Sequence, residues 1–207
     1  MPTSFSYQLY SSRNHGPLGR TLAMLSRHGY SEVEGFGGVY DKPEELRRLL
    51  DANGLTMPTG HFAVEMMERK PKDVLAIART LGMNKLVMPY LPPEARPASA
   101  SGWKALAKRL NAIAAAYRPE GFGVAWHNHD FEFTKLKDGS VPQTLIFESA
   151  PLLDWEIDVA WVVRGKANPI RWIKDYASII TIAHVKDIAP RGENEDEDGW
   201  PMSASAP

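Results

Sequence analysis

The stretch WHNHDFEF, residues 126–133, directly follows the apolar segment GVA at residues 123–125 and brings together two imidazoles and two carboxylates. Two later apolar runs also end on polar residues, WEID at Asp158 and IAH at His184. The carboxyl ends of parallel strands meet at one edge of a sheet or barrel, so three such endings would converge. The sequence therefore predicts one site at these strand ends, suited to a cation.

Apolar or β-branched runs alternate with longer helical patterns along the rest of the chain. This rhythm is typical of repeated βα units and predicts an α/β protein with a parallel sheet. The seven predicted strands are Phe5–Tyr10, Ser31–Phe36, Thr56–Phe62, Lys85–Tyr90, Gly123–His129, Asp154–Val159 and Ile179–Lys186.

Helices are predicted between these strands from proline starts and glycine or proline stops. In the segment Asn168–Ala177, Asn168 is the expected cap and Pro169 the first helical residue. A short helix, or none, is expected in Lys135–Pro151, where KDGS at 137–140 is typical of a hairpin turn. The other predicted helices are Leu18–His28, Pro43–Asn53, Pro71–Leu81 and Ser101–Tyr117.

The composition is that of an ordinary globular protein. With 207 residues, 43% of them hydrophobic, the chain is long enough to bury a substantial core and is expected to form one domain, although two small ones would also fit. A net charge of -1 with scattered basic residues provides no field for nucleic acid. A small-molecule partner is the better expectation.

The chain contains no cysteine, so any metal must be held by His, Asp, Glu or water. No signal-peptide pattern begins the chain, and no apolar run approaches the ~18 residues of a membrane span. We therefore expect a cytoplasmic protein without a membrane partner.

Polar residues gather at the predicted strand ends. Alternate residues of a strand share a face, which pairs His127 with His129, Glu156 with Asp158, and His184 with Lys186. In a parallel barrel, catalytic groups lie at the C-terminal ends of the strands. The candidate residues at these ends are Glu34, His61, His127, His129, Asp158, His184 and Lys186.

Three motifs in this order resemble the sugar phosphate isomerase/epimerase family, which has a xylose-isomerase-like TIM barrel. They are GVAWHNHDFEF at 123–133, EIDVAW at 156–161 and IAHVKD at 182–187, and the resemblance covers residues 4 to about 199. The combination is specific, whereas HNH alone would be weak. It implies a (β/α)8 TIM-barrel type fold, here incomplete, over residues 1–190, followed by an acidic loop and tail at 191–207.

The resemblance also implies a divalent-metal site whose ligands come from strands five to eight. By position, the first three ligands match Glu132, Asp158 and His184. His127 lies nearer the strand end than Glu132 and is the alternative ligand from the fifth strand. Without a metal, Glu132 would be a surface acid, Asp158 a loop cap and His184 a hydrogen-bonded core residue.

The remaining candidates fit a sugar pocket. Glu132, as a carboxylate, and Lys186 are the candidate catalytic residues. Lys186 would contact a substrate oxygen or phosphate, or else form a salt bridge with Asp158 or Asp187. The expected substrate-binding residues are Glu34, His61, His127, His129 and Lys186, while tryptophans at 126, 155 and 161 would form either a pocket wall or, more commonly, core packing.

These groups suit isomerisation or epimerisation of a sugar or sugar phosphate. A metal, which Mn, Co, Mg, Fe or Zn would serve equally, polarises the carbonyl while a carboxylate removes the neighbouring proton. One alternative is a lyase or dehydratase that acts on a keto-sugar or inosose with the same site. Another is a non-catalytic partial barrel, and an endonuclease is disfavoured because a basic groove is missing.

The end of the chain departs from the family pattern. The family's eighth strand carries a further metal-binding glutamate, and a complete barrel typically needs ~250 residues. Here Gly192–Asp198 holds five acidic residues, and Trp200–Pro207 resembles a disordered tail, an appended sequence or an out-of-frame ending. We therefore expect the eighth strand to be missing, activity to be impaired, and the chain to self-associate through the open barrel edges.

Overall fold

The computed structural model describes residues 5–186 of the chain. Within them, seven strands form one parallel sheet in the order β1 to β7, which confirms the predicted incomplete TIM-barrel type fold. Asp187 and the expected acidic loop and tail lie outside the described residues. The strands are β1 Ser6–Gln8, β2 Glu32–Gly35, β3 Thr56–His61, β4 Lys85–Met88, β5 Gly123–His127, β6 Asp154–Asp158 and β7 Ile180–His184.

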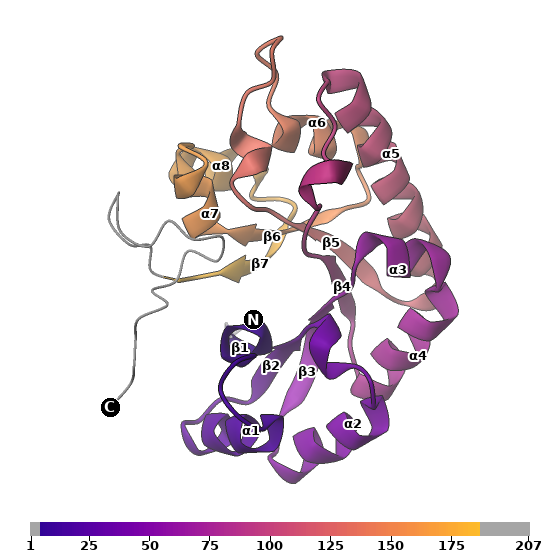
Figure 1. Ribbon diagram of the computed structural model, residues 1–207, viewed down its shortest axis with the longest axis vertical. Coiled ribbons are helices and arrows are strands. Elements are labelled where there is room, and N and C mark those ends of the chain that lie inside the picture. The colour runs from indigo at the N-terminus through magenta and orange to yellow at the C-terminus, as the bar shows by residue number, and fades with distance from the viewer. Residues whose placement is uncertain (1–4, 187–207) are drawn as a thin grey trace.

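The helices lie along the outer side of the curved sheet, while the strands follow one another around an arc from β1 to β7 (Figure 1). The α-helices are α1 Leu18–Arg27, α2 Pro43–Ala52, α3 Val64–Arg69, α4 Pro71–Leu81, α5 Ala100–Tyr117, α6 Pro142–Ser149, α7 Val159–Arg164 and α8 Pro169–Tyr176. The 3₁₀ turns are η1 Leu9–Ser12, η2 Gly37–Val39, η3 Pro93–Ala95, η4 Arg118–Glu120 and η5 Phe131–Phe133.

The helix starts and stops agree with their sequence signals. Pro71 is the first residue of α4, which ends at Gly82 in the left-handed conformation with φ 75°. The side chain of Asn168 caps α8 by accepting a hydrogen bond from the Arg171 amide, as predicted. Proline has no amide hydrogen to satisfy in a first turn, and glycine adopts positive φ without steric cost, so these residues set the helix boundaries.

Several elements differ from the predicted pattern. The fifth strand ends at His127 instead of His129, because the chain leaves the sheet there and enters η5 at Phe131. The segment Lys135–Pro151 contains the short helix α6, which is one of the two outcomes expected there. The unpredicted helix α7 follows β6 without a loop because Asp158 caps it. Both differences arise at the strand ends, where side chain to backbone hydrogen bonds replace the sheet ladder.

Strand register brings the polar endings together. His127 of β5 lies opposite Glu156 of β6, and Asp158 of β6 lies opposite His184 of β7. At the other end of the sheet, Lys85 Nζ of β4 lies 2.5 Å from Asp154 Oδ2 of β6. This ion pair ties β4 to β6 at the N-terminal end of the barrel, away from the polar endings.

Most large apolar side chains pack into one core between the sheet and the helices. Trp126 and Trp155 are fully buried within it, so the core-packing alternative holds for both. None of the helices in residues 5–186 is both long and apolar enough to cross a membrane.

Tyr40 occupies space that two glycines leave between β2 and β3. Its ring stacks on Phe62 with centroids 4.8 Å apart, and its buried hydroxyl adjoins Gly35 and Gly60. A Cβ on Gly35 would lie 2.6 Å from the Tyr40 hydroxyl oxygen, and a Cβ on Gly60 would collide with the same oxygen. Both strands therefore need glycine at this point, immediately beside Glu34 and His61.

We expect Gly60→Ala to destabilise the protein by roughly 1–3 kcal/mol, because the added methyl group would overpack a closed core. Its Cβ would also lie 2.7 Å from Met83 Cε. Urea unfolding followed by tryptophan fluorescence measures the loss. Gly37→Ala is the control, since nothing lies within 4 Å of its Cβ position. Equal stability of the two variants would contradict the packing argument, and Tyr40→Phe should partly rescue Gly60→Ala.

Candidate functional site

Two carboxylates and two imidazoles alternate in a closed ring near the C-terminal ends of four strands. His61 Nε2 of β3 lies 2.8 Å from Glu156 Oε2 of β6 and 3.1 Å from Glu34 Oε1 of β2. His184 Nε2 of β7 lies 2.9 Å from the same Glu34 oxygen and 3.5 Å from the same Glu156 oxygen. We call these four residues the Glu–His ring. The imidazole of each histidine in this ring thus lies between the carboxylates of Glu34 and Glu156.

The ring shifts the pKa of every member. Burial alone would lower the pKa of His61, but Glu34 and Glu156 raise it to about 9. Burial likewise opposes protonation of His184, yet Glu156, Asp158 and Glu34 raise its pKa to about 10. Burial would raise the pKa of Glu34, but the two imidazoles hold it well below its usual range. At Glu156, burial and the neighbouring Glu34 raise the pKa.

His127 of β5 approaches the ring without a hydrogen bond. Its Nδ1 lies 3.0 Å from Glu156 Oε2, but this buried nitrogen has no hydrogen-bond partner among the described residues. Burial, together with repulsion from His184 and His61, holds the pKa of His127 well below its usual value. The imidazole is therefore neutral, with a ring nitrogen close to a carboxylate oxygen.

His61, His127, Glu156 and His184 could together hold a metal ion. One ligand atom from each lies within 4.8 Å of all the others. Imidazole nitrogen and carboxylate oxygen are common ligands of divalent transition metals, so the donor chemistry fits such a cation. In the described part of the chain this is the one group of three or more His, Asp or Glu residues brought so close together.

This group overlaps only partly with the sequence prediction. The predicted ligands Glu132, Asp158 and His184 share only His184 with it. His127, the predicted alternative to Glu132, does belong to the group, whereas Glu156 was not among the predicted site residues. The sequence feature that could have indicated Glu156 is the strand face that it shares with Asp158, two residues further along the chain.

Asp158 lies next to the Glu–His ring and faces both His184 and Lys186. Its Oδ1 accepts a hydrogen bond from the Trp161 amide at 3.0 Å, so it caps α7. Its Oδ2 lies 2.7 Å from Lys186 Nζ and 3.7 Å from His184 Nδ1. Burial would raise the pKa of Asp158, but the neighbouring His184, His127 and Lys186 side chains lower it. Asp158 thus caps the helix α7 instead of a loop, and Lys186 forms the salt bridge with Asp158 that was one of its two expected roles.

Glu132 is fully buried, so it is not a surface acid. Its Oε2 accepts a hydrogen bond from the His129 amide at 3.0 Å, while its Oε1 has no hydrogen-bond partner among the described residues. Burial raises the pKa of Glu132 to about 8. A carboxyl group with such a pKa can give or take a proton near neutral pH.

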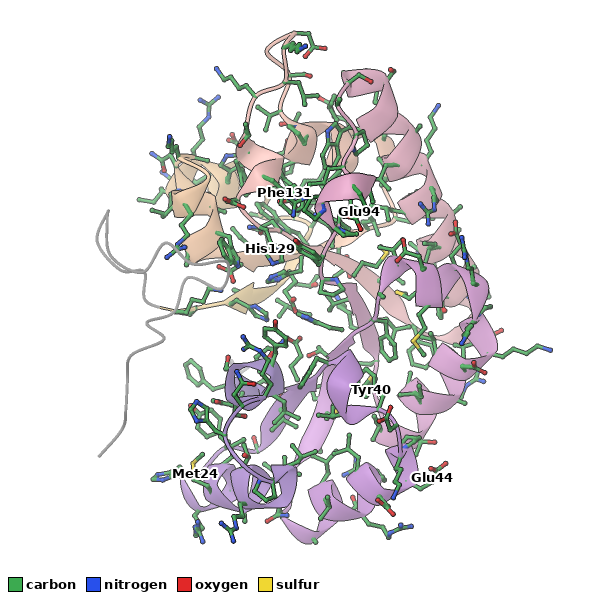
Figure 2. The ribbon with its side chains drawn as sticks, in the orientation of Figure 1. Met24, Tyr40, Glu44, Glu94, His129 and Phe131 are labelled. Carbon is green, nitrogen blue, oxygen red and sulfur yellow. The ribbon has the colours of Figure 1, made fainter. Side chains whose placement is uncertain are left out.

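Aromatic rings surround His129 beside the ring of charges. The His129 ring centroid lies 5.0 Å from Tyr90, 6.0 Å from Phe131 and 5.1 Å from Trp161. Figure 2 shows His129 and Phe131 next to each other near the strand ends. Burial lowers the pKa of His129 to about 2. Lys186 Nζ lies 5.0 Å from the Trp161 ring, which joins this aromatic wall to the Asp158 ion pair.

Asn128, in the middle of the HNH motif, connects β5 to β6. Its Oδ1 accepts hydrogen bonds from Trp155 Nε1 at 2.9 Å and from the Asp158 amide at 3.0 Å. Its Nδ2 donates to the Asp158 carbonyl at 3.1 Å, and the whole side chain is buried. The amide thus fixes the backbone of Asp158 where the sheet ladder between the two strands has ended.

A cavity of about 400 Å³ lies elsewhere, between η1, α1, η2 and α2. Its walls include Leu9, Phe36 and Leu46, and it shares no lining residue with the Glu–His ring or His127. Its wall residues bring together no group of possible metal ligands comparable to the one above. The candidate functional site is therefore the group of His and Glu side chains at the strand ends, and not this cavity.

Comparisons with known proteins agree on the fold. No family model matches the chain, and no curated protein matches it either. Among solved structures, a sugar phosphate isomerase/epimerase from Parabacteroides distasonis ATCC 8503 is 21% identical with a TM-score of 0.80. That match covers 94% of this chain and 79% of the other.

Two further solved structures are similar. The probable 3-DHS dehydratase AsbF from Bacillus anthracis has a TM-score of 0.72 at 15% identity, covering 91% of this chain and 74% of the other. A D-psicose 3-epimerase has a TM-score of 0.65 at 10% identity, covering 88% and 72%. The fold that these structures share with this chain is therefore a TIM barrel of parallel βα units. The sugar phosphate isomerase/epimerase structure carries the name of the family that the sequence motifs resemble, and its similarity to this chain is one of fold.

Without metal, the protein should lose stability as pH rises from 7 to 9.5. A histidine whose pKa is higher folded than unfolded stabilises fully below about pH 6.5, and this contribution disappears as pH passes the folded value. For His61 that value is about 9, so we expect a loss of about 1–3 kcal/mol. Titration of Glu132 in this range acts in the same direction.

Urea unfolding of chelator-treated protein at both pH values measures this loss. His61→Gln should show a clearly smaller decrease than the unaltered protein, and the exposed His28→Gln should behave like the unaltered protein. An identical pH dependence in His61→Gln would show that the ring does not hold the extra proton.

Proposed function

We propose that this protein is a divalent-metal-dependent isomerase or epimerase that acts on a sugar or sugar phosphate by removing a proton next to a carbonyl. The observation that carries the proposal is the group of converging metal ligands at the strand ends, where TIM-barrel enzymes place their catalytic residues. Its fold neighbours, which include isomerases and epimerases, support the same class of reaction.

His184 is common to the predicted ligand set and to the group in the structure, so the cation would be held beside it. The residues that would hold it are His184 with His61, His127 and Glu156, or His184 with Glu132 and Asp158. Bound there, a divalent cation supplies Lewis-acid polarisation of a carbonyl oxygen.

Glu132 is the proposed acid–base residue. Its free Oε1 would take the proton from the carbon next to the carbonyl and return it to a neighbouring carbon or to the opposite face. The first outcome is isomerisation and the second is epimerisation. A pKa of about 8 suits both proton removal and proton return near neutral pH.

Lys186 is the proposed substrate-orienting residue. Its ammonium group is held by Asp158 and lies against Trp161, so it can direct an N–H toward a sugar oxygen while the indole faces the sugar ring. Glu34, His61, His127 and His129 remain predicted substrate-binding residues. In this structure Glu34 and His61 are engaged in the Glu–His ring.

A lyase or dehydratase is the second candidate function, favoured by the fold similarity to the probable 3-DHS dehydratase. The same base would remove the same proton, but a neighbouring hydroxyl would then leave as water instead of the proton returning. Both reactions share an exchange-prone C–H bond, so proton exchange detects either one before the product is known.

Solvent exchange tests this proposal. We expect the purified protein with Mn²⁺ or Co²⁺ to catalyse incorporation of solvent deuterium next to the carbonyl of one member of a panel of ketoses, keto-glycosides, inososes and their phosphates, measured by proton NMR. Glu132→Gln should reduce the rate by about 10²–10⁴-fold. The exposed Glu94→Gln is the matched control. If no substrate exchanges with any metal, the partial barrel is non-catalytic.

We also propose that a small molecule is the partner, that the protein is cytoplasmic, and that copies associate through the sheet edges. In residues 5–186, β1 pairs only with β2 and β7 pairs only with β6. The flanking residues Phe5 and Val185 are 80% and 88% exposed, and Ile170 on α8 is 65% exposed. Light scattering should therefore show a dimer or larger species. A monodisperse monomer with a single cooperative melt would refute the association.

A further inference from the structure

We infer that this chain binds one divalent transition-metal ion through His61, His127, Glu156 and His184, and that Glu132 and Asp158 do not ligate it. The inference deepens the proposed function by naming the ligands and the class of metal. It concerns binding alone, so it can fail while the proposed reaction holds, and the reverse is equally possible.

Convergence on one oxygen atom is the first observation. Three imidazole nitrogens, from His61, His127 and His184, lie 2.8, 3.0 and 3.5 Å from Glu156 Oε2. Ligand atoms around a tetrahedral cation with bonds of ~2.0–2.2 Å lie roughly 3.3–3.6 Å from one another. Small side-chain movements would therefore admit a cation among these four residues.

The second observation is a buried nitrogen without a partner. His127 Nδ1 approaches Glu156 Oε2 closely but makes no hydrogen bond with it, and Glu156 Oε1 also has no hydrogen-bond partner among the described residues. Buried polar atoms are normally satisfied, because leaving one unpaired costs about 1–3 kcal/mol. A cation next to Glu156 would satisfy both groups.

The surrounding residues resemble an outer shell around such a cation. With His184 Nε2 directed at the group, its Nδ1 faces Asp158 Oδ2 at 3.7 Å. A metal-bound histidine commonly donates its other N–H to a carboxylate, which orients the ring. Asp158 is suited to that role because its own oxygens already engage the Trp161 amide and Lys186.

Glu34 is a second carboxylate next to the same two imidazole nitrogens, where its negative charge would favour a cation. Its Oε1 contacts His61 Nε2 and His184 Nε2, and its Oε2 accepts a hydrogen bond from Thr59 Oγ1 at 2.6 Å. Glu34 is thus held by β3, and its negative charge adjoins both imidazoles without belonging to the four-residue group.

Glu132 does not share this geometry. One of its oxygens is engaged by the His129 amide, and the side chain falls outside the group of converging ligand atoms. Its Oε1 has no hydrogen-bond partner among the described residues, so it is the atom that the proposed proton transfer would use. Glu132 would therefore act only as the base, whereas the sequence motifs predicted that it is both the base and a metal ligand.

Three imidazole nitrogens and one carboxylate oxygen also select the kind of metal. Imidazole suits zinc, cobalt, iron and other first-row transition metals, whereas Mg²⁺ and Ca²⁺ prefer shells made entirely of oxygen. We therefore expect micromolar Co²⁺ or Zn²⁺ to bind in the presence of millimolar Mg²⁺.

Cobalt binding to tag-free, chelator-treated protein provides the test. Co²⁺ titration, followed by visible d–d absorption and by calorimetry, should show one ion per chain. Two fully buried glutamates form a matched pair. Glu156→Gln should weaken Co²⁺ binding by more than about 100-fold, whereas Glu132→Gln should keep both the affinity and the spectrum.

Two further variants keep the test decisive. If Glu156→Gln fails to fold, His127→Gln should still shift the cobalt bands, because one nitrogen ligand is lost. Asp158→Asn should weaken binding by roughly 10–100-fold without moving the bands, as expected for an outer-shell residue. The inference is overturned if the unaltered protein binds no Co²⁺, if Mg²⁺ displaces it, or if Glu132→Gln abolishes binding while Glu156→Gln preserves it.

Discussion

Burial of two carboxylates beside two imidazoles is the constraint on which the rest of the site depends. Glu34 and Glu156 are 3% and 0% exposed, and an unpaired buried charge costs several kcal/mol. Each carboxylate is therefore tolerated only because His61 and His184 lie between them. Two imidazolium protons carry the same charge as one divalent cation, so exchanging one for the other leaves the net charge of this interior unchanged.

The remaining structure keeps these groups in place and separates their tasks. Tyr40 fills the space beside Gly35 and Gly60, which holds β2 and β3 together next to two members of the ring. An ion pair between Lys85 and Asp154 ties β4 to β6 at the opposite end of the barrel. The Glu–His ring is thus charged and closely packed, and the side chains around His129 are aromatic.

The sequence predicted the fold because apolar runs and helical patterns alternate, and because polar residues end the strands. It located His61, His127, Asp158 and His184 at one edge for the same reason. Glu156 was missed as a member of the converging group because it lies within a strand, where a local pattern cannot show which distant side chains face it. His61 and Glu156 are 95 residues apart in sequence, so their 2.8 Å contact is a product of strand order and register.

Local turns explain the other differences. The pattern extended the fifth strand to His129, but the 3₁₀ turn that follows His127 carries Glu132 into the interior. That turn depends on hydrogen bonds between side chains and backbone, such as the one from the His129 amide to Glu132, which alternation of apolar and polar residues does not encode.

The side chain of Asn128 also determines how this region opens. It holds the Asp158 amide, the Asp158 carbonyl and the Trp155 indole by three buried hydrogen bonds. The Asp158 amide is therefore protected from hydrogen exchange with water as long as the Asn128 side chain holds β5 to β6. Release of the Asn128 side chain would free the Asp158 amide and the Asp158 carbonyl together, which links the middle of the HNH motif to the end of β6.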